Sequence, residues 1–216
     1  MKKTRIILLV ILILSSLPAA AQERWRFDFL LGVPYNFSTP LSIEQEGYDD
    51  INLGNADYES KPFVNPIYYS WRLGRWKRDS AWELELLHQK LHLQNKLREV
   101  DHFEVSHGYN LITINRAWQS DSLTYRLGAG IVLAHPQTTI RGKTLFEQGG
   151  VLDTGYYIAG PTLQVAVDKK FPVTNRLYII TEGKLTASHA IIPISGGQAK
   201  VPNLALHGLL GLGYKF

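Results

Sequence analysis

The last fourteen residues of the chain, 203–216, alternate between two kinds of side chain. One parity carries a row of large apolar residues: Leu204, Leu206, Leu210, Leu212, Tyr214 and Phe216. The other parity carries small or polar residues apart from Leu209. A period of two is that of a β-strand whose two faces meet different surroundings. One face of this strand is too apolar for water, so we expect apolar surroundings on that side.

The amino terminus has the features of a secretory signal. Lys2, Lys3 and Arg5 precede an apolar run over residues 6–14, and Ala19-Ala20-Ala21 follows. This order of basic, apolar and small residues is typical of a signal peptide. The apolar run is shorter than the roughly 20 residues of a membrane-spanning helix. We predict cleavage near Ala21, which divides the chain into a signal peptide, 1–21, and a single domain, 22–216.

Composition narrows the function further. The formal charge is +4, but three of the 23 basic residues lie in the predicted signal, which leaves 20 against 19 acidic residues. The mature chain therefore lacks the excess of positive charge that a nucleic-acid-binding protein needs. There is no Cys, which excludes a disulfide-stabilised domain and a lipoprotein. No later segment is apolar and long enough for a spanning helix, so any insertion into a membrane must use strands.

Period-two segments bounded by turn residues predict eight strands. They are Arg24–Ser38, Asn65–Trp76, Ser80–Leu93, His102–Trp118, Ser122–Pro136, Thr154–Lys170, Arg176–Ile191 and Val201–Phe216. Each exceeds the roughly 9–11 residues of a tilted membrane strand. The second, fourth and sixth connections are short turns. The first, third, fifth and seventh, at 39–64, 94–101, 137–153 and 193–200, are mostly long, an alternation typical of outer-membrane barrels.

Aromatic residues gather near the predicted strand ends. The five Trp fall toward the end that carries the short turns: Trp25, Trp71, Trp76, Trp82 and Trp118. A second group falls toward the other end: Tyr35, Phe37, Tyr68, Tyr69, Phe103, Tyr109, Tyr156 and Tyr157. Two aromatic belts of this kind are typical of the interfaces of a membrane. We predict a lipid-facing aromatic girdle.

Strand parity places a set of charged side chains inside the barrel at similar depths. They are Arg26, Asp28, Arg72, Glu83, Glu85, Arg126, Glu182 and Lys184. Isolated charges in a narrow lumen are costly, whereas four acids and four bases satisfy one another. An eight-stranded barrel is only wide enough for its side chains to fill it. We predict a polar plug that closes the lumen; a gated route for protons or small ions is the alternative.

The His residues raise the question of catalysis. Six of the seven lie toward the ends of strands that carry the long loops, where His88, His92 and His107 face outward by parity. The weak catalytic candidates are two adjacent pairs and one further His: Ser106, His107, Ser188, His189 and His135. Neighbouring side chains on a strand point to opposite faces, so a pair can cooperate only across a bulge. A change of parity in the fourth strand predicts such a bulge near Gly108.

The eight-strand pattern and the carboxy-terminal Phe216 resemble the small outer-membrane barrels. That group includes the membrane domain of outer-membrane protein A, the outer-membrane protein W family and the lipid A-modifying barrels. The resemblance implies an all-β, eight-stranded antiparallel up-and-down transmembrane β-barrel in a Gram-negative outer membrane. It also implies assembly through the terminal Phe, contact with lipid and lipopolysaccharide, and a monomer.

The resemblance leaves the activity open. Some lipid-modifying barrels use a His-X-Ser element in which His activates Ser, and none of the seven His is followed by Ser two positions later. We therefore predict a non-enzymatic barrel with a charge-plugged lumen, whose surface loops serve a structural or binding role, without metal or cofactor. Two alternatives stay open: a lipid A or phospholipid acyl hydrolase, and lateral transport of a small hydrophobic molecule past Gly128, Gly130, Gly160 and Pro161.

Overall fold

The computed structural model describes residues 24–146 and 148–216. The predicted signal peptide and its cleavage site lie outside these residues. Among the residues described, no helix has the length and apolarity required to cross a membrane.

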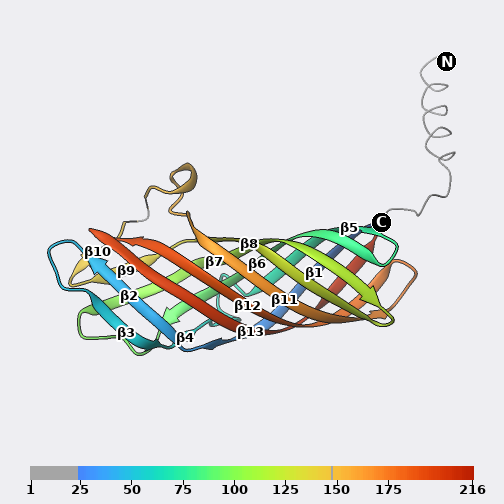
Figure 1. Cartoon of the computed structure of the whole chain (residues 1–216), viewed down its shortest axis with the longest axis horizontal. Helices are drawn as coiled ribbons and strands as arrows, with labels where there is room; N and C mark the ends of the chain where they lie inside the picture. The colour runs from blue at the N-terminus through green and yellow to red at the C-terminus, as the bar shows by residue number, and fades with distance from the viewer. Residues whose placement is uncertain (1–23, 147) are drawn as a thin grey trace, which may run out of the picture.

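Eight long antiparallel strands form a closed ring (Figure 1). They are β1 (Arg24–Phe37), β5 (Tyr69–Lys77), β6 (Ser80–Leu93), β7 (Val100–Ser120), β8 (Leu123–Ala134), β11 (Tyr157–Pro172), β12 (Leu177–Ile194) and β13 (Gly197–Lys215). Each pairs with its sequence neighbour in this series, and β13 returns to β1 over twelve residue pairs, from Arg26 opposite Lys215 to Phe37 opposite Leu204. The predicted fold, an eight-stranded antiparallel up-and-down barrel, is confirmed.

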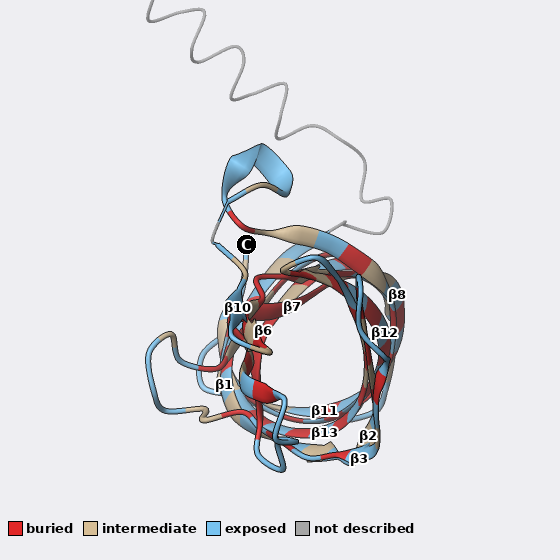
Figure 2. Ribbon diagram, turned by 90° about the vertical axis from the view of Figure 1, so that its left-hand side faces the viewer, coloured by how far each residue is buried: buried red, intermediate tan, exposed pale blue. Residues whose placement is uncertain are grey.

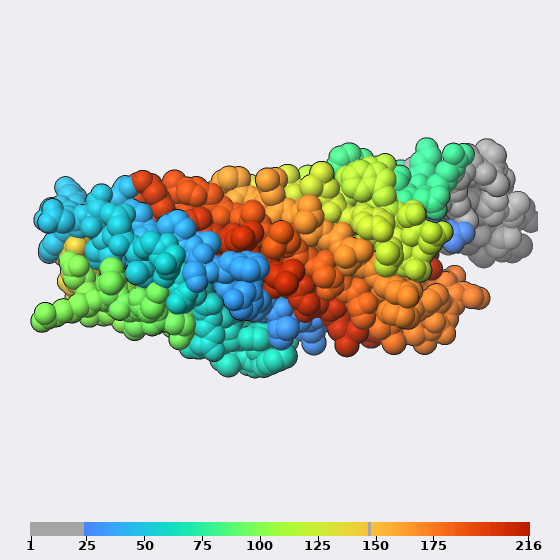
Figure 3. All heavy atoms as spheres, turned by 60° about the horizontal axis from the view of Figure 1, so that its bottom comes forward, coloured from blue at the N-terminus to red at the C-terminus, as the bar shows by residue number. Residues whose placement is uncertain are grey.

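The two ends of the barrel differ. At one end, the turn end, short turns join β5 to β6, β7 to β8 and β11 to β12, and both Arg24 and Phe216 lie there (Figure 1). The opposite end, the loop end, carries further short strands: β2 (Thr39–Gln45), β3 (Ile51–Ala56), β4 (Tyr58–Glu59), β9 (Gln137–Ile140) and β10 (Lys143–Thr144). These extensions lengthen the molecule at the loop end (Figure 3).

The seventh connection differs from its prediction. Instead of a loop over 193–200, β12 and β13 stay paired up to Ile194 opposite Gly197, and the turn is Ser195-Gly196. The glycine there has a positive φ of 73°, which a tight hairpin turn requires. The strand β13 then gains a second partner, because its first residues pair with β2. The first long loop is likewise partly ordered as the β2–β3 hairpin.

Burial alternates along most of the ring, as Figure 2 shows by the change of colour, except toward the loop end of β6 and β7, where consecutive residues are buried. On β1 the outward residues Phe29, Leu31 and Val33 are 42–48% exposed, whereas the inward Asp28 and Leu30 are at most 3% exposed. The same alternation gives β11, β12 and β13 an apolar outer row. The outside of the barrel is therefore a continuous apolar wall, the reverse of a water-soluble protein.

The predicted bulge in the fourth long strand is present. Gln89 pairs with Tyr109 and Leu91 with Val105, so three residues of β7 lie opposite Lys90 alone. Gly108 is among the three and has a φ of +137°. The bulge adds an even number of residues, so odd-numbered side chains face inward on both sides of it, as Phe103 and Thr113 do, and the supposed conflict between Phe103 and Ile114 does not exist.

The strand β5 is shorter than predicted and leaves a seam in the wall. It begins at Tyr69, so neither β1 beyond Leu31 nor β6 beyond His88 has a β5 partner. Residues 58–68 fill the interval, where β4 pairs with β6 at only two positions, Tyr58 opposite Leu93 and Glu59 opposite His92. Asn36 donates to Tyr58 O (3.1 Å) and Ser60 Oγ (2.9 Å), and Ser60 donates to Lys90 O (2.8 Å). Side-chain hydrogen bonds thus replace backbone pairing along this seam.

The interior has two levels. Toward the loop end the lumen holds an apolar core drawn from all sides of the ring, including Leu41, Leu91, Phe103, Tyr109 and Val201, each at most 2% exposed. Toward the turn end most inward side chains are polar or charged, apart from a small apolar cluster of Trp76, Ala81 and Ala117. Tyr68, Phe103 and Tyr109 belong to this interior, so their assignment to an outer aromatic belt was wrong.

The Trp residues divide in the same way. Trp25, Trp82 and Trp118 are 43–62% exposed on the outer wall near the turn end. Trp76 is 2% exposed and faces the lumen, where the Arg26 guanidinium lies 3.9 Å from its ring centroid. Its inclusion in the outward-facing girdle was therefore wrong: parity on β5 turns it inward, opposite the outward Leu73.

The bulge generates a stability prediction. A Cβ at position 108 would lie 2.3 Å from the Asn110 side chain, at a positive φ that L-residues avoid. We expect Gly108→Ala to lower the free energy of unfolding by about 1–3 kcal/mol, measured by urea unfolding of the refolded barrel in detergent. Gly54→Ala, where a Cβ would meet open space, is the matched control and should change it by less than about 0.5 kcal/mol. Equal effects at both positions would contradict a strained bulge.

Candidate functional site

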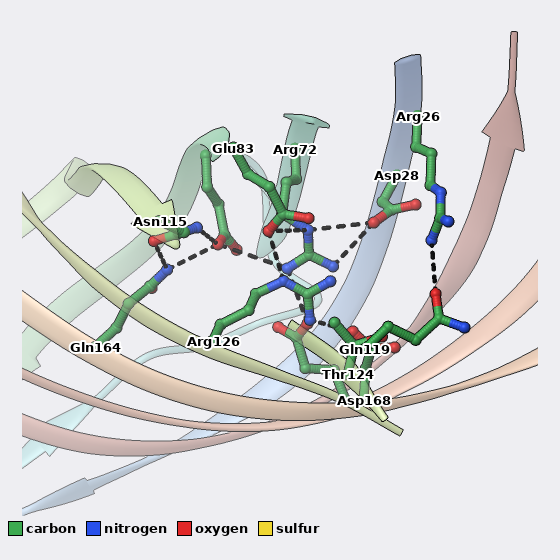
Figure 4. A network of polar contacts seen from close by, with 12 residues as sticks. Arg26, Asp28, Arg72, Glu83, Asn115, Gln119, Thr124, Arg126, Gln164 and Asp168 are labelled. Atoms are coloured by element: carbon green, nitrogen blue, oxygen red, sulfur yellow. Dashed lines mark hydrogen bonds and ion pairs between the residues drawn. The ribbon is translucent and has the colours of Figure 1, made fainter. Parts of the chain in front are cut away.

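A network of charged and polar side chains crosses the lumen at the turn-end level (Figure 4). Its members come from β1, β5, β6, β7, β8, β11 and β12, so it joins all sides of the ring. The predicted inward charges other than Arg26 lie within it, each at most 4% exposed: Asp28, Arg72, Glu83, Glu85, Arg126, Glu182 and Lys184.

Arg72 is one of two cations at the centre of the network. Its guanidinium contacts Asp28 through Nε and Nη2, at 3.2 and 3.0 Å from Oδ2. Nη1 donates to Glu182 Oε2 at 2.8 Å, and two further carboxylates, Glu83 and Glu85, lie 3.6 Å from guanidinium nitrogens. Arg72 thus contacts carboxylates from β1, β6 and β12 and ties three separate strands together.

Arg126 is the second central cation. Its Nε donates to Glu83 Oε2 at 2.6 Å, and Nη1 contacts both Asp168 and Glu182, the latter at 3.1 Å. Two guanidiniums repel each other when they are brought close in a medium of low dielectric. Glu83 and Glu182 each contact both Arg72 and Arg126, so shared carboxylates hold the two cations together.

Glu85 is the most heavily hydrogen-bonded acid of the network. It accepts from Lys184 Nζ, from Ser70 Oγ at 2.7 Å, and from Asn115 Nδ2 and Gln164 Nε2 at 2.8 Å each. A fully buried carboxylate is tolerated only when its lone pairs are occupied in this way. The amides of Asn115 and Gln164 and the hydroxyl of Ser70 therefore provide the hydrogen bonds to Glu85 that Lys184 alone does not.

Two inward glycines provide the space that these side chains occupy. A Cβ at Gly128 would lie 1.9 Å from Asn115 Oδ1, and one at Gly213 would lie 2.2 Å from the Tyr178 ring. Tyr178 in turn donates to Asp28 Oδ1 at 2.5 Å. Gly128 was considered as a weak point of the wall, but β8 pairs continuously with both neighbours at this position. Its role in the structure is to accommodate the network.

Two charged members of the network and one Tyr were not predicted, and one predicted charge lies apart from it. Neither Asp168 nor Lys170, whose Nζ lies 2.7 Å from Asp168 Oδ1, was in the predicted charge set. Tyr178 was also missed. Parity on β11 and β12 would have found all three. Arg26 lies nearer the turn end and donates to Gln119 Oε1 at 3.2 Å, apart from the carboxylates (Figure 4).

His207 lies at the boundary between the charged level and the apolar core. Its Nδ1 is 3.0 Å from Tyr68 Oη and its Nε2 is 2.9 Å from Thr186 Oγ1, and it is 1% exposed. Both ring nitrogens have partners, so this His is a structural component of the interior. From His207 toward the loop end the inward side chains become apolar, and Leu30 and Leu209 are the first residues of the apolar core.

The catalytic candidates do not converge on a nucleophile and base. Ser106 Oγ donates to Gln137 rather than to a His. His107 is exposed on the outer face, where its ring lies 5.0 Å from that of His135. The His135 ring also packs 4.8 Å from Tyr156. These rings form an aromatic cluster at the loop end of β7 and β8.

The second pair is separated by the strand itself. Ser188 faces the lumen, where its Oγ is 2.9 Å from Tyr109 Oη, while the adjacent His189 is exposed on the outer wall. In the part of the chain that the structure describes, no group of three or more His, Asp or Glu has a geometry suited to a metal ion.

Comparison with known proteins returns structures but no sequence family. No protein-family model matches the chain, and no curated protein matches it. Among solved structures, the chain is similar to the outer membrane protein AlkL (TM-score 0.48, 15% identity, 90% of each chain covered). It is also similar to OprG from Pseudomonas aeruginosa (TM-score 0.45, 10% identity, 91% of this chain and 96% of that one). A third is Ail of Yersinia pestis (TM-score 0.40, 8% identity, 90% and 97%).

The network makes Arg126 a sensitive position. Arg126→Met removes the shared partner of three buried carboxylates, so we expect the free energy of unfolding to fall by about 3–5 kcal/mol. Arg98→Met, the same substitution at an exposed loop residue, should change it by less than about 0.5 kcal/mol. Chemical denaturation of both variants in the same detergent measures the difference. Equal stability of the two variants would show that the ion pairs of Arg126 do not hold the barrel together.

Proposed function

We propose that the chain is an outer-membrane barrel of a Gram-negative bacterium, with the turn end in the periplasm and the loop end outside the cell. The continuous apolar wall supports lipid as the solvent of the outer face. The exposed Trp25, Trp82 and Trp118 near one rim fit a membrane interface. The terminal Phe216, whose amide donates to Trp25 O at 3.0 Å, serves in this proposal as the recognition element for assembly.

Within that setting we propose a non-enzymatic role in which the interior seals the barrel and the loop end binds partners. The observation that carries this proposal is the two-level interior. An ion-paired network spans one level of the lumen and a packed apolar core spans the next, with side chains that are at most a few per cent exposed. A solute would have to break buried ion pairs and displace a core to pass, which favours a closed barrel over a pore.

The loop end offers the surface for such a role. The β2–β3 hairpin extends beyond the ring and is held by β13, where Lys200 and Gln198 both donate to Glu44. These hydrogen bonds hold the pKa of Glu44 below its usual range. Arg141 on the neighbouring turn reaches the hairpin by donating to Asp49 O at 2.8 Å. The extensions therefore form one connected surface, proposed here as the contact site for lipopolysaccharide or an external partner.

Conductance measures the closure directly. The purified, refolded barrel in planar bilayers should show no pore-sized single-channel currents, because the network and the core both obstruct the lumen. An outer-membrane porin inserted in the same way is the positive control. Cell fractionation should place the protein in the outer membrane. Regular openings of pore size would contradict the proposed closure, while a soluble periplasmic protein would contradict the proposed location.

A second candidate function, lateral passage of a small hydrophobic molecule, is favoured by the seam between β1 and β6. There the wall is closed by the two-residue pairing of β4 with β6 and by the side-chain bonds of Asn36 and Ser60, in place of a long ladder. The apolar level of the lumen, including Leu87 and Leu91, lies close by. Passage would require only local opening of this segment.

Loosening the seam tests this candidate. If the seam is a route, Asn36→Ala with Ser60→Ala should raise the rate at which an alkane enters vesicles that contain the barrel, because two of the closing donors are lost. The exposed Gly54→Ala is the control. Uptake equal to that of protein-free vesicles, for both the native chain and the double variant, would remove the lateral route.

A further inference from the structure

A row of alternating Trp and Arg side chains encircles part of the outer wall near the turn end. Cross-strand pairing places Trp25 opposite Arg75, Arg75 opposite Trp82 and Trp82 opposite Arg116. The alternation of side chains along each strand directs Trp25, Arg75, Trp82 and Arg116 to the outer face. One step nearer the turn end, Lys77 pairs with Ser80 and Ser80 with Trp118. Cationic and aromatic side chains from β1, β5, β6 and β7 are thereby assembled on one outer patch.

The patch contains a hollow. Its lining includes Arg75, Lys77, Arg78 and Arg116, two walls of aromatic surface from Trp82 and Trp118, and a single acid, Asp79. Four cations against one carboxylate leave the hollow strongly positive. Its position on the outer wall, next to exposed Trp side chains, is the level at which lipid headgroups meet protein.

Arg116 differs from the cations of the lumen. In the lumen, Arg72 and Arg126 contact buried carboxylates on several sides. On the patch, Arg116 Nη2 donates to the neutral Ser80 Oγ at 2.8 Å, and its guanidinium lies 5.4 Å from the Trp82 ring and 5.8 Å from the Trp118 ring. These contacts orient the guanidinium between two aromatic faces without neutralising its charge. A cation beside hydrocarbon is favourable only if an anion meets it.

We propose that this hollow binds the phosphate headgroup of an anionic phospholipid from the periplasmic leaflet. Arg116 supplies a planar fork that suits phosphate oxygens, and Arg75, on the other side of Trp82, adds positive charge. Lys77 and Arg78 add positive charge at the rim, which favours a lipid with a net negative headgroup over a zwitterionic one. Trp82 and Trp118 contact the glycerol and the upper acyl chain. The proposal rests on the membrane location and orientation proposed above.

Lipid retention tests the site. The barrel is reconstituted in mixed vesicles of phosphatidylglycerol and phosphatidylcholine at equal fractions, extracted in mild detergent and analysed by native mass spectrometry. We expect the native chain to retain phosphatidylglycerol over phosphatidylcholine by about 25-fold, because Arg75 and Arg116 each contribute about a factor of five near a membrane surface. In Arg75→Gln with Arg116→Gln the preference should fall to nearly none.

Two variants and a competition with phosphate distinguish a general effect of positive charge from binding of the headgroup in this hollow. Arg98→Gln with Lys143→Gln removes the same charge at the loop end and should leave the preference unchanged. Arg116→Lys keeps the charge but loses the fork, so it should retain part of the preference and show that the variants still fold. Inorganic phosphate at millimolar concentration should not displace the lipid, and displacement would assign the hollow to a free anion instead.

The outcomes also separate this proposal from the one on which it rests. Equal retention of both lipids by the native chain, or an unchanged preference in the Arg75 and Arg116 variant, would overturn the headgroup site while the protein still fractionates with the outer membrane. Absence from the outer membrane would remove the location itself.

Discussion

Closure of the sheet is the constraint on which the rest of the structure depends. A strand with an apolar outer face can leave neither of its edges unpaired in hydrocarbon, because each unsatisfied backbone group there costs several kcal/mol. The twelve residue pairs between β1 and β13 remove both edges at once. Closure at eight strands then fixes the lumen at a width that side chains fill, so the inward side chains must pack against one another. They do so in two levels, one charged and one apolar.

Strand number, faces and most strand bounds could be predicted from the sequence, because lipid on one side and a narrow lumen on the other impose a strict period of two. The carboxy-terminal strand and β1 follow the pattern almost without exception. The bulge at Gly108 is present in β7, but Phe103 faces inward, so the parity change from which it was predicted is not. The early end of β5 could not be predicted in this way. Asn65 to Tyr68 look strand-like, and Tyr68 keeps the inward parity of β5, but its backbone N–H donates to Pro62 O at 2.8 Å, a local bond in place of a ladder.

The sequence predicts that charged side chains fill part of the lumen, but it does not predict which of them contact one another. Parity placed Arg72, Arg126 and Glu182 in the lumen, yet which acid meets which base depends on strand tilt and on space. Gly213 decides where Tyr178 lies, and Tyr178 occupies one oxygen of Asp28. For the outer patch, the sequence indicated some of the residues but not their arrangement. Its Trp residues were noted as a belt, but the alternation with Arg75 and Arg116 appears only when three strands are set in register.

The shared carboxylates have a consequence for how the barrel can assemble. Glu182 on β12 contacts Arg72 on β5 and Arg126 on β8, so its partners come from distant parts of the chain. A partial sheet of β1 to β8 contains Arg72 and Arg126 but lacks Glu182. A partial sheet of β11 to β13 contains Glu182 but lacks both arginines. Such fragments cannot satisfy their buried charges and gain little from entering a bilayer alone. Insertion and closure are thereby coupled into a single cooperative event, and partly built forms are selected against by their own unpaired ions.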